Sequence, residues 1–491
     1  MKDILQSKLE QQKKLQKKKK EQLAKLLKHS TLLEYLTTRY KIVTILAASF
    51  AFLILFGTLL LSLPFSNRTA GTSILTHLFV ATSAVCVTGL SPITVAEQYT
   101  LFGKIIMILL MQVGGLGLMT FVSMALTLGR NKFSFKELTA FADAAGKHGY
   151  YDVSGYLKRI LLYTFAFEFL GLIALAIRFT ADFGMKQGLF NALFISVAAF
   201  TNAGFDCFAS DSLARYATDP LVSITVMLLI IVGGLGFMVW IELRHHYQDM
   251  KKKRLPLRSV FSSFSVHTKV VCTITFWLIV SGTLLFLLCE WNNPLTLGTH
   301  SIPDKFLIAA FQSVTLRTAG FATISMAACR RVTRMIMCLF MIIGGSPGGT
   351  AGGIKTTTFL VIIVMLRSFF KNEPDNCNLF HRRIRRTDFV SAELILTIYM
   401  IFLFIGVALL SVTEPEIPVL DLTFEGVSAI ATVGLSADVT SSLSILGRVI
   451  IIVMMFTGRI GPLAMIEIFE RKSTAPPHEH VHYPHADILI G

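Results

Sequence analysis

Long uncharged stretches alternate with shorter apolar segments along this chain. The stretches 42–67, 105–129, 220–241 and 270–289 contain no Asp, Glu, Lys or Arg. Each is long enough to cross a hydrocarbon layer of about 30 Å as a helix. A buried helix of a soluble protein would need neighbours on every face. The pattern therefore predicts membrane spans.

We predict eight spanning helices in four pairs, and each pair encloses an apolar segment too short to span a bilayer. Short segments of this kind are typical of re-entrant pore helices. The spans are expected near 42–63, 102–128, 158–178, 220–243, 270–289, 332–366, 391–412 and 446–468. The short segments are expected near 72–90, 188–205, 304–321 and 421–436.

Positive charge predicts the orientation of these spans. Of the 46 Lys and Arg residues, 33 fall in the predicted segments 1–41, 129–159, 244–269 and 367–390 and in the tail from 470. The positive-inside rule places these segments, and both termini, in the cytoplasm. Topology thus accounts for the net charge of +16, and we expect a lipid bilayer and no nucleic acid as partner.

A glycine recurs after each short segment, at intervals of 115, 116 and 114 residues. Near-equal spacing indicates four tandem repeats, and all four enter and leave on the same side. We predict an all-α membrane protein with four helix–pore helix–filter–helix units around a pseudo-four-fold pore. The units are 42–128, 158–243, 270–366 and 391–469, separated by cytoplasmic segments 129–157, 244–269 and 367–390 and flanked by 1–41 and 470–491.

The recurring glycines suggest how a cation would be held. Backbone carbonyls can replace an ion's hydration shell, and glycine permits the positive φ that such a turn often needs. Glycines also permit close helix packing, which suffices for Gly114, Gly115, Gly233 and Gly234 but does not explain four glycines in one register. The candidate filter residues are Val87, Thr88, Gly89, Asn202, Ala203, Gly204, Thr318, Ala319, Gly320, Thr432, Val433 and Gly434.

The segments TSAVCVTGL (82–90), AFTNAGF (199–205), SVTLRTAGF (313–321) and ATVGLS (431–436) resemble the four filters of the Trk/Ktr/HKT potassium transporter superfamily, most nearly its KtrB-type subunits. This resemblance implies K⁺ uptake across the plasma membrane, with Na⁺ dependence in several members. It also implies a homodimer and a cytosolic KtrA-type nucleotide-binding ring. Position 89 is a glycine in this chain. In the family, a serine at the matching position is linked to sodium permeation.

The sixth span is interrupted by GGSPGGTAGGIKTTT (344–358), in which no regular helix should persist. Irregular backbone at membrane depth lines a cavity or lies inside the protein, so we predict a gate; a kinked helix is the alternative. The segment resembles the family's intramembrane gating loop, and Arg459 matches the arginine beside it. Lys355 would either act with Arg459 in the gate or extend to cytoplasmic water. The candidate gate residues are Gly344, Gly345, Gly348, Gly349, Gly352, Gly353, Lys355 and Arg459.

Glu168 is a carboxylate inside the third span. Such a residue binds a coupling cation or, as we favour, pairs with a neighbouring donor that joins the repeats. We expect no enzyme, because the cytoplasmic loops are too short for a catalytic domain and Gly353-Ile354-Lys355 lacks the Gly-Lys pair of a phosphate-binding loop. The seven scattered cysteines predict neither a disulfide framework nor a zinc site.

Three other functions remain open at this point. A sodium-conducting member of the same superfamily would share every feature above. A secondary transporter with alternating access often has inverted repeats, whereas the repeats here are parallel. A membrane scaffold or receptor gives no reason for four glycines in one register.

Overall fold

The computed structural model describes residues 42–69, 71–128, 153–208, 212–253, 263–372 and 377–461. The described chain is helical except for loops and one hairpin, in which β1 (Asn378–Leu379) pairs antiparallel with β2 (Arg382–Arg383). The prediction of an α-helical fold is therefore confirmed. The predicted terminal segments 1–41 and 470–491, and most of the predicted loop 129–157, lie outside the described residues.

The first half of the chain forms two groups of helices. The first group comprises α3 (Ile42–Leu61), η2 (Pro64–Ser66), α4 (Ile74–Cys86), α5 (Val95–Gln98) and α6 (Leu101–Leu128). The second group comprises α8 (Val153–Thr201), η3 (Ala214–Tyr216), α9 (Pro220–Leu235) and α10 (Phe237–Lys253).

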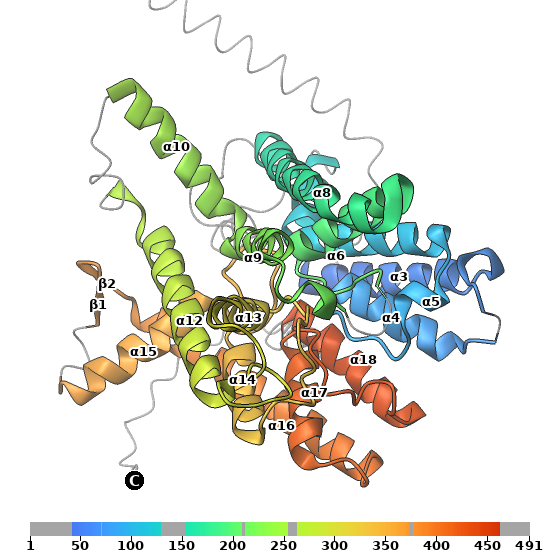
Figure 1. Ribbon diagram of the computed structural model, residues 1–491. Coiled ribbons are helices and arrows are strands. Elements are labelled where there is room, and N and C mark those ends of the chain that lie inside the picture. Colours follow the sequence, from blue (N-terminus) through green and yellow to red (C-terminus); the bar gives the residue numbers. More distant parts are fainter. Residues whose placement is uncertain are drawn as a thin grey trace, which may run out of the picture.

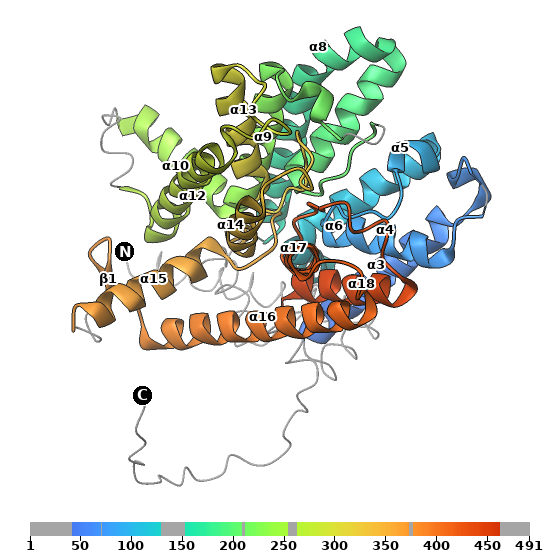
Figure 2. The ribbon, with the colours of Figure 1, turned by 60° about the horizontal axis from the view of Figure 1, so that its bottom comes forward.

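The second half repeats this order. The third group comprises α12 (Val266–Glu290), α13 (Ile302–Thr315), α14 (Arg331–Ile342) and α15 (Thr356–Phe370). The fourth group comprises α16 (Arg386–Thr413), α17 (Val419–Ile430) and α18 (Ile445–Ile460), and Figure 2 shows α16 running beside α17 and α18. The four groups lie around a common centre in chain order (Figure 1).

The second group has its first span and its short helix almost continuous. A span ending near 178 and a separate short helix from 188 were expected, and the break lies between these limits, at Gly184 of α8, where φ is +75°. The residues between 179 and 187 include no proline, and glycine is the one residue there that adopts positive φ at little cost. The helix therefore continues to Gly184 before it reverses.

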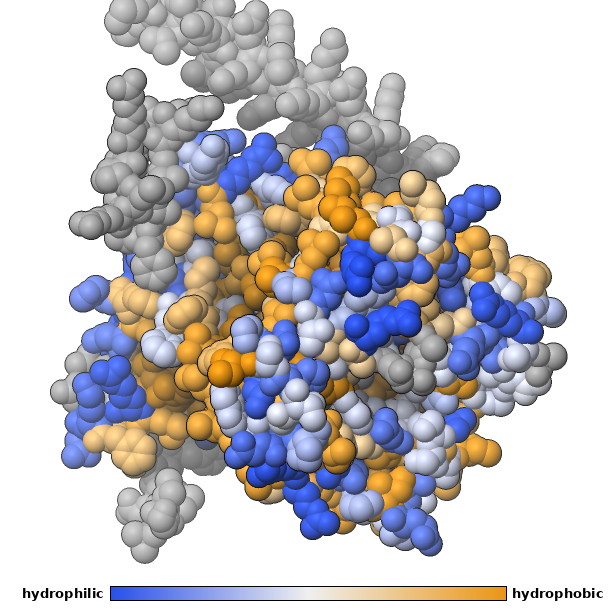
Figure 3. Space-filling view, viewed as in Figure 1, coloured by the Kyte–Doolittle hydropathy of each residue, from blue (hydrophilic) through white to orange (hydrophobic). Residues whose placement is uncertain are grey.

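The outer faces of the helices are apolar. Phe52 and Leu55 on α3, Phe169 on α8, Leu288 on α12 and Phe404 on α16 are all exposed. Figure 3 shows broad areas of hydrophobic side chains on the face seen there. Exposed apolar surface of this extent indicates contact with lipid rather than water.

Three described helices are long and apolar enough to cross a membrane, namely 158–201, 266–290 and 386–413. The pair α9 and α10, bent by 93° at Gly236, would be a fourth if it counts as one span. The other predicted spans coincide with shorter or interrupted helices, such as α18. The number of eight spans therefore stays a prediction.

Carboxylates join the ends of helices in the third and fourth groups. Glu290 at the end of α12 accepts the Arg330 N–H at 2.9 Å, immediately before α14 begins. Glu414 after α16 accepts the Ser444 N–H at 2.9 Å, immediately before α18 begins. A charge-assisted bond at the same place in both groups fixes how each first helix meets its second helix.

Candidate functional site: a ring of four glycine turns above a docked loop

Each short helix ends in the same backbone turn. The residue two positions before the recurring glycine has positive φ in every group: 57° at Val87, 60° at Asn202, 62° at Thr318 and 51° at Thr432. The glycines themselves have φ of +102°, +68°, +77° and +94° in chain order. We call residues 87–89, 202–204, 318–320 and 432–434 the four glycine turns.

These turns hold strained residues. Left-handed backbone is unusual for any residue with a side chain, and Val87, Thr318 and Thr432 are β-branched. Strain of this kind costs about 1–3 kcal/mol at each residue and persists only where the surroundings impose it. Its recurrence in all four groups indicates a functional constraint rather than a chance loop conformation.

The four glycines form a closed ring. A methyl group on Gly89 would lie 2.8 Å from the Ala203 carbonyl oxygen, and one on Gly204 would lie 2.8 Å from that of Ala319. One on Gly320 would lie 2.6 Å from the Val433 oxygen. Gly434 completes the ring, because its Cα faces the Thr88 carbonyl with no space for a methyl group. Each glycine thus faces the next group's carbonyl.

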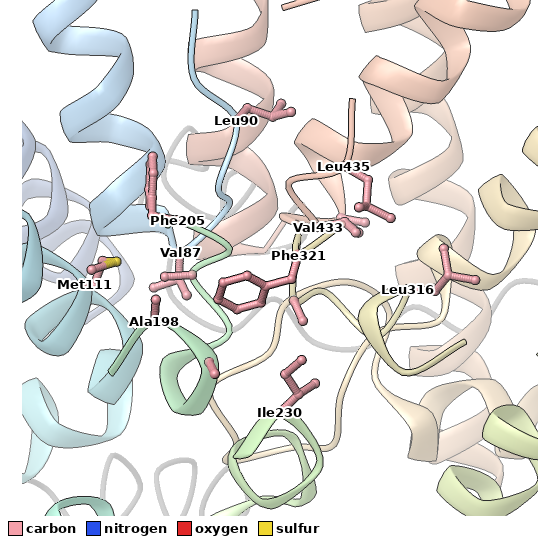
Figure 4. Packing of buried hydrophobic residues seen from close by; sticks show 14 of the residues in the cluster. Val87, Leu90, Met111, Ala198, Phe205, Ile230, Leu316, Phe321, Val433 and Leu435 are labelled. Atoms are coloured by element: carbon pink, nitrogen blue, oxygen red, sulfur yellow. The ribbon is translucent and has the colours of Figure 1, made fainter. Parts of the chain in front are cut away.

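Apolar residues support this ring from outside. The residue after each glycine is at most 2% exposed, and Figure 4 shows these four side chains with Val87 and Val433 among the packed residues: Leu90, Phe205, Phe321 and Leu435. Ser83 and Ser428 in the short helices accept the Gly89 and Gly434 N–H groups, each at 3.0 Å. Because the N–H groups are bonded outward in these two turns, the carbonyls are free to face the ring.

Buried polar atoms without partners gather at the turns. The Thr88 and Thr432 hydroxyls and both amide atoms of Asn202 make no hydrogen bond, and all three residues are fully buried. Buried polar atoms normally have a partner, which is often water or an ion. The turns are therefore suited to hold a cation by oxygen atoms, and no carboxylate is needed for it.

A glycine in the second helix lets it approach each turn. A methyl group added to Gly114, Gly233 or Gly458 would overlap a carbonyl oxygen of the short helix in the same group. That oxygen belongs to the residue four positions before the ring glycine of the group. Three residues further on, each helix breaks at a glycine of positive φ: Gly117, Gly236 and Gly461. The second helices therefore pack directly under the turns, and their regular helical conformation ends or is broken there.

In the third group the break is extended into a loop. Residues 343–355 fold back on themselves, since the Gly344 N–H donates to the Ile354 carbonyl at 2.9 Å and the Gly345 N–H to the Gly352 carbonyl at 3.2 Å. We call residues 343–355 the glycine-rich loop. A merely kinked helix is thus wrong, because an ordered non-helical loop, with a parallel bridge between Ile343 and Ile354, separates α14 from α15.

The glycine-rich loop is docked on the broken end of α9. The Ser346 and Thr350 N–H groups donate to the carbonyls of Gly234 and Gly233 at 3.0 and 3.1 Å. Beyond the break, the Phe237 N–H donates to the Gly348 carbonyl at 3.1 Å. Carbonyls freed by the helix break thus hold the loop.

The loop also touches the glycine turns. The Gly352 N–H donates to the Thr318 hydroxyl at 3.0 Å, and the Gly352 Cα leaves no space for a methyl group beside the Thr432 hydroxyl. The Thr350 hydroxyl donates to the Phe200 carbonyl at 3.1 Å. The loop therefore lies directly against three of the four groups.

Arg459 links this loop to the first group. Its Nη1 donates to the Thr350 carbonyl at 2.7 Å, and its Nη2 donates to the carbonyls of Gly114 and Gly115. Lys355 instead donates to the Ala351 carbonyl within its own loop at 2.7 Å. The predicted proximity of Arg459 to the loop matches this geometry.

Helix packing alone was the expected role of Gly114, Gly115, Gly233 and Gly234. The structure adds that their carbonyls accept the hydrogen bonds that hold the loop and Arg459. The signal was present, because Gly458-Arg459-Ile460-Gly461 follows the pattern of Gly114-Gly115-Leu116-Gly117 and Gly233-Gly234-Leu235-Gly236. Arg459 occupies the place of the second glycine in that pattern.

The fold and the site together define a class. Apolar-faced helices surround a ring of glycines that each face a backbone carbonyl of the next group, as expected of a helical membrane protein that passes a cation. Residues 43–475 match the model of the TrkH family, described as a cation transport protein. The chain belongs to this family.

Known relatives agree with this assignment. The chain is 35% identical over 447 residues to Ktr system potassium uptake protein B of Bacillus subtilis, covering 91% of this chain and 96% of that one. It is 32% identical over 456 residues to the potassium/sodium uptake protein NtpJ of Enterococcus hirae, covering 91% and 97%. These relatives are named as uptake proteins, in keeping with the expectation that the chain is no enzyme.

The fold also matches a solved structure. The potassium transporter TrkH from Vibrio parahaemolyticus aligns with a TM-score of 0.62 and 19% identity, covering 86% of this chain and 85% of that chain. At this identity the match supports the fold and leaves the ion to other arguments.

Proposed function

We propose that this chain takes up K⁺ across the plasma membrane through a single pore formed by four helix–pore helix–filter–helix units. The four glycine turns are the selectivity filter, and their carbonyls replace the water around the ion. The observation that carries the proposal is the closed ring, in which each glycine faces the carbonyl of the next group. The potassium uptake named in two relatives supports K⁺ as the ion.

The glycine-rich loop is the gate of this pore. It contacts the side chains of Thr318 and Thr432, which belong to two of the filter segments. It is held by Arg459 from the fourth group and by the end of α9 from the second. Breaking these few hydrogen bonds would release the loop without unfolding a helix, as a gate requires.

Partners and orientation follow the family. We propose a homodimer, each protomer with its own pore, and a cytosolic KtrA-type nucleotide-binding ring, because the word "system" in the name of the Bacillus relative implies a further subunit. Both termini lie in the cytoplasm according to the positive-inside rule.

Sodium conduction is the second candidate, because the Enterococcus relative is named as a potassium/sodium uptake protein. All four filter positions are glycine here, which favours K⁺. Dependence of K⁺ uptake on Na⁺ is a separate question from conduction of Na⁺. Alternating access remains the third candidate, and it predicts strictly coupled, saturating flux.

Cation flux into liposomes holding the purified chain tests these candidates. Wild type should pass K⁺ in preference to Na⁺. Gly89→Ser should lose that preference, because its side chain would meet the Ala203 carbonyl. A deletion within 344–358 should raise the flux. Absence of flux from folded wild type, with and without a regulatory ring, would contradict the proposal.

A further inference from the structure

Glu168 is a buried carboxylate whose charge has no partner. It lies in the apolar span 158–201 and is 5% exposed, and its Oε1 makes no hydrogen bond. None of the ion pairs among the described residues includes it. An isolated carboxylate at this depth is costly, so a bound cation or a proton must neutralise it.

Two further polar groups without partners adjoin this carboxylate. Thr164 is fully buried, its hydroxyl makes no hydrogen bond, and it precedes Glu168 by one turn on the same face of α8. From α6, the Gln112 amide faces the carboxylate, yet neither of its atoms makes a hydrogen bond of good geometry. Such groups rarely stay unpaired in a protein, and three of them meet here.

We propose that a monovalent metal cation, Na⁺ in the first instance, binds between the Glu168 carboxylate, the Thr164 hydroxyl and the Gln112 carbonyl oxygen. Carboxylate, hydroxyl and amide oxygens are the ligands of hard cations. One positive charge neutralises the carboxylate, whereas a divalent ion would leave net charge in an apolar region. A proton would also remove the charge, and the response to pH separates that case in the test below.

The site is connected to the second glycine turn. The Ser196 hydroxyl donates to the backbone carbonyl of Glu168 at 2.6 Å, which joins the two halves of α8. Gly115 of α6 packs against the Thr201 side chain at the end of the same helix, directly before Asn202. A cation between α6 and α8 would therefore stabilise the helix ends that position the second turn. This consequence for transport rests on the proposed function, whereas binding itself does not.

Thermal unfolding of the purified full-length chain tests the site. Na⁺ is titrated against choline at constant, saturating K⁺, so that filter occupancy does not change. The midpoint of wild type should rise by about 2–3 °C at a Na⁺ concentration about 100 times the Kd, which is the shift expected for a chain of 491 residues. Glu168→Gln should abolish the rise, and Thr164→Val should move it to higher Na⁺ concentration.

Glu393→Gln is the matched control, because Glu393 is an exposed carboxylate on α16 and its loss should leave the rise unchanged. If Glu168→Gln does not fold, the comparison of Thr164→Val with wild type carries the test. Absence of a Na⁺ response in wild type would overturn the proposal, as would an equal response in Glu168→Gln. A midpoint that responds to pH but not to Na⁺ would overturn it in favour of a proton.

Potassium flux from the same preparations separates this inference from the proposed function. Stabilisation by Na⁺ without any K⁺ flux would support the cation site and contradict the proposed function. K⁺ flux in wild type without any effect of Na⁺ on the unfolding midpoint would support the proposed function and contradict the cation site. Flux that increases with Na⁺ in wild type but not in Glu168→Gln would support both the site and its connection to the filter.

Discussion

Replacing Gly320 by alanine offers the sharpest test of the carbonyl ring. Gly320 has φ of +77°, and a methyl group there would lie 2.6 Å from the Val433 carbonyl oxygen. The same methyl would lie 3.0 and 3.2 Å from the Cα atoms of Gly204 and Gly434. One added carbon would therefore press on the turns of two other groups at once.

The magnitude follows from these distances. Ordinary contact begins near 3.4 Å, so the Val433 oxygen must retreat by about 0.8 Å from its place 2.6 Å away. Backbone must give way, since no flexible side chain is involved. The left-handed φ adds a separate cost of about 1–2 kcal/mol, which any alanine at such a position would carry.

Gly184→Ala is the control for that second cost. Gly184 has φ of +75°, nearly that of Gly320, and nothing lies within 4 Å of where its methyl group would be. The positive φ should lower the thermal stability of both variants by a similar amount. The clash should lower the stability of Gly320→Ala further. Only Gly320→Ala should change ion preference.

Liposome flux with K⁺ and with Na⁺ is the assay. We expect the preference of Gly320→Ala for K⁺ over Na⁺ to fall by about tenfold or more, equivalent to about 1.4 kcal/mol of differential binding. Gly184→Ala should keep the wild-type preference. If Gly320→Ala kept both rate and preference, the carbonyl beside it would not coordinate the ion, and the filter assignment would be refuted.

Three further predictions concern the contacts of the glycine-rich loop and the carboxylate that follows the second glycine turn. Thr318→Val removes the acceptor of the Gly352 N–H, which costs about 1–3 kcal/mol in the docked loop, so K⁺ flux without a regulatory ring should rise; an unchanged flux would place the gate elsewhere. Arg459→Gln removes three hydrogen bonds to carbonyls and should also raise this flux, with greater proteolysis of the loop as an independent sign of release. Burial raises the pKa of Asp206, two residues after Gly204, to about 6, against the lowering effects of the Phe208 N–H, the Ser212 hydroxyl and Lys104. Its negative charge is therefore lost as the external pH falls through 6, so K⁺ entry should fall between pH 7 and 5 in wild type and be nearly constant in Asp206→Asn.

Local pattern predicted the helices and the register of the four glycines well. Apolar stretches without charge specify helices in a membrane because each helix satisfies its own backbone hydrogen bonds. The near-equal intervals between glycines placed Gly89, Gly204, Gly320 and Gly434 at equivalent positions, and their positive φ matches that expectation. These features depend on residues close in the sequence.

Helix boundaries were less predictable. The break in α8 at Gly184 has no proline to mark it, and continuing the helix costs little until a glycine allows the reversal. The interruption between α14 and α15 was predictable because six glycines and a proline fall among the ten residues from Gly344 to Gly353.

An apolar helical protein with four equivalent glycines and a loop that cannot be helical follows from the amino-acid sequence. The contacts of these features depend on the tertiary structure. Gly352 meets Thr318, Arg459 reaches Gly114 from 345 residues away, and Gln112 meets Glu168 across two groups. The physical reason is that such partners lie on helices whose packing depends on every other helix, so no local pattern encodes them.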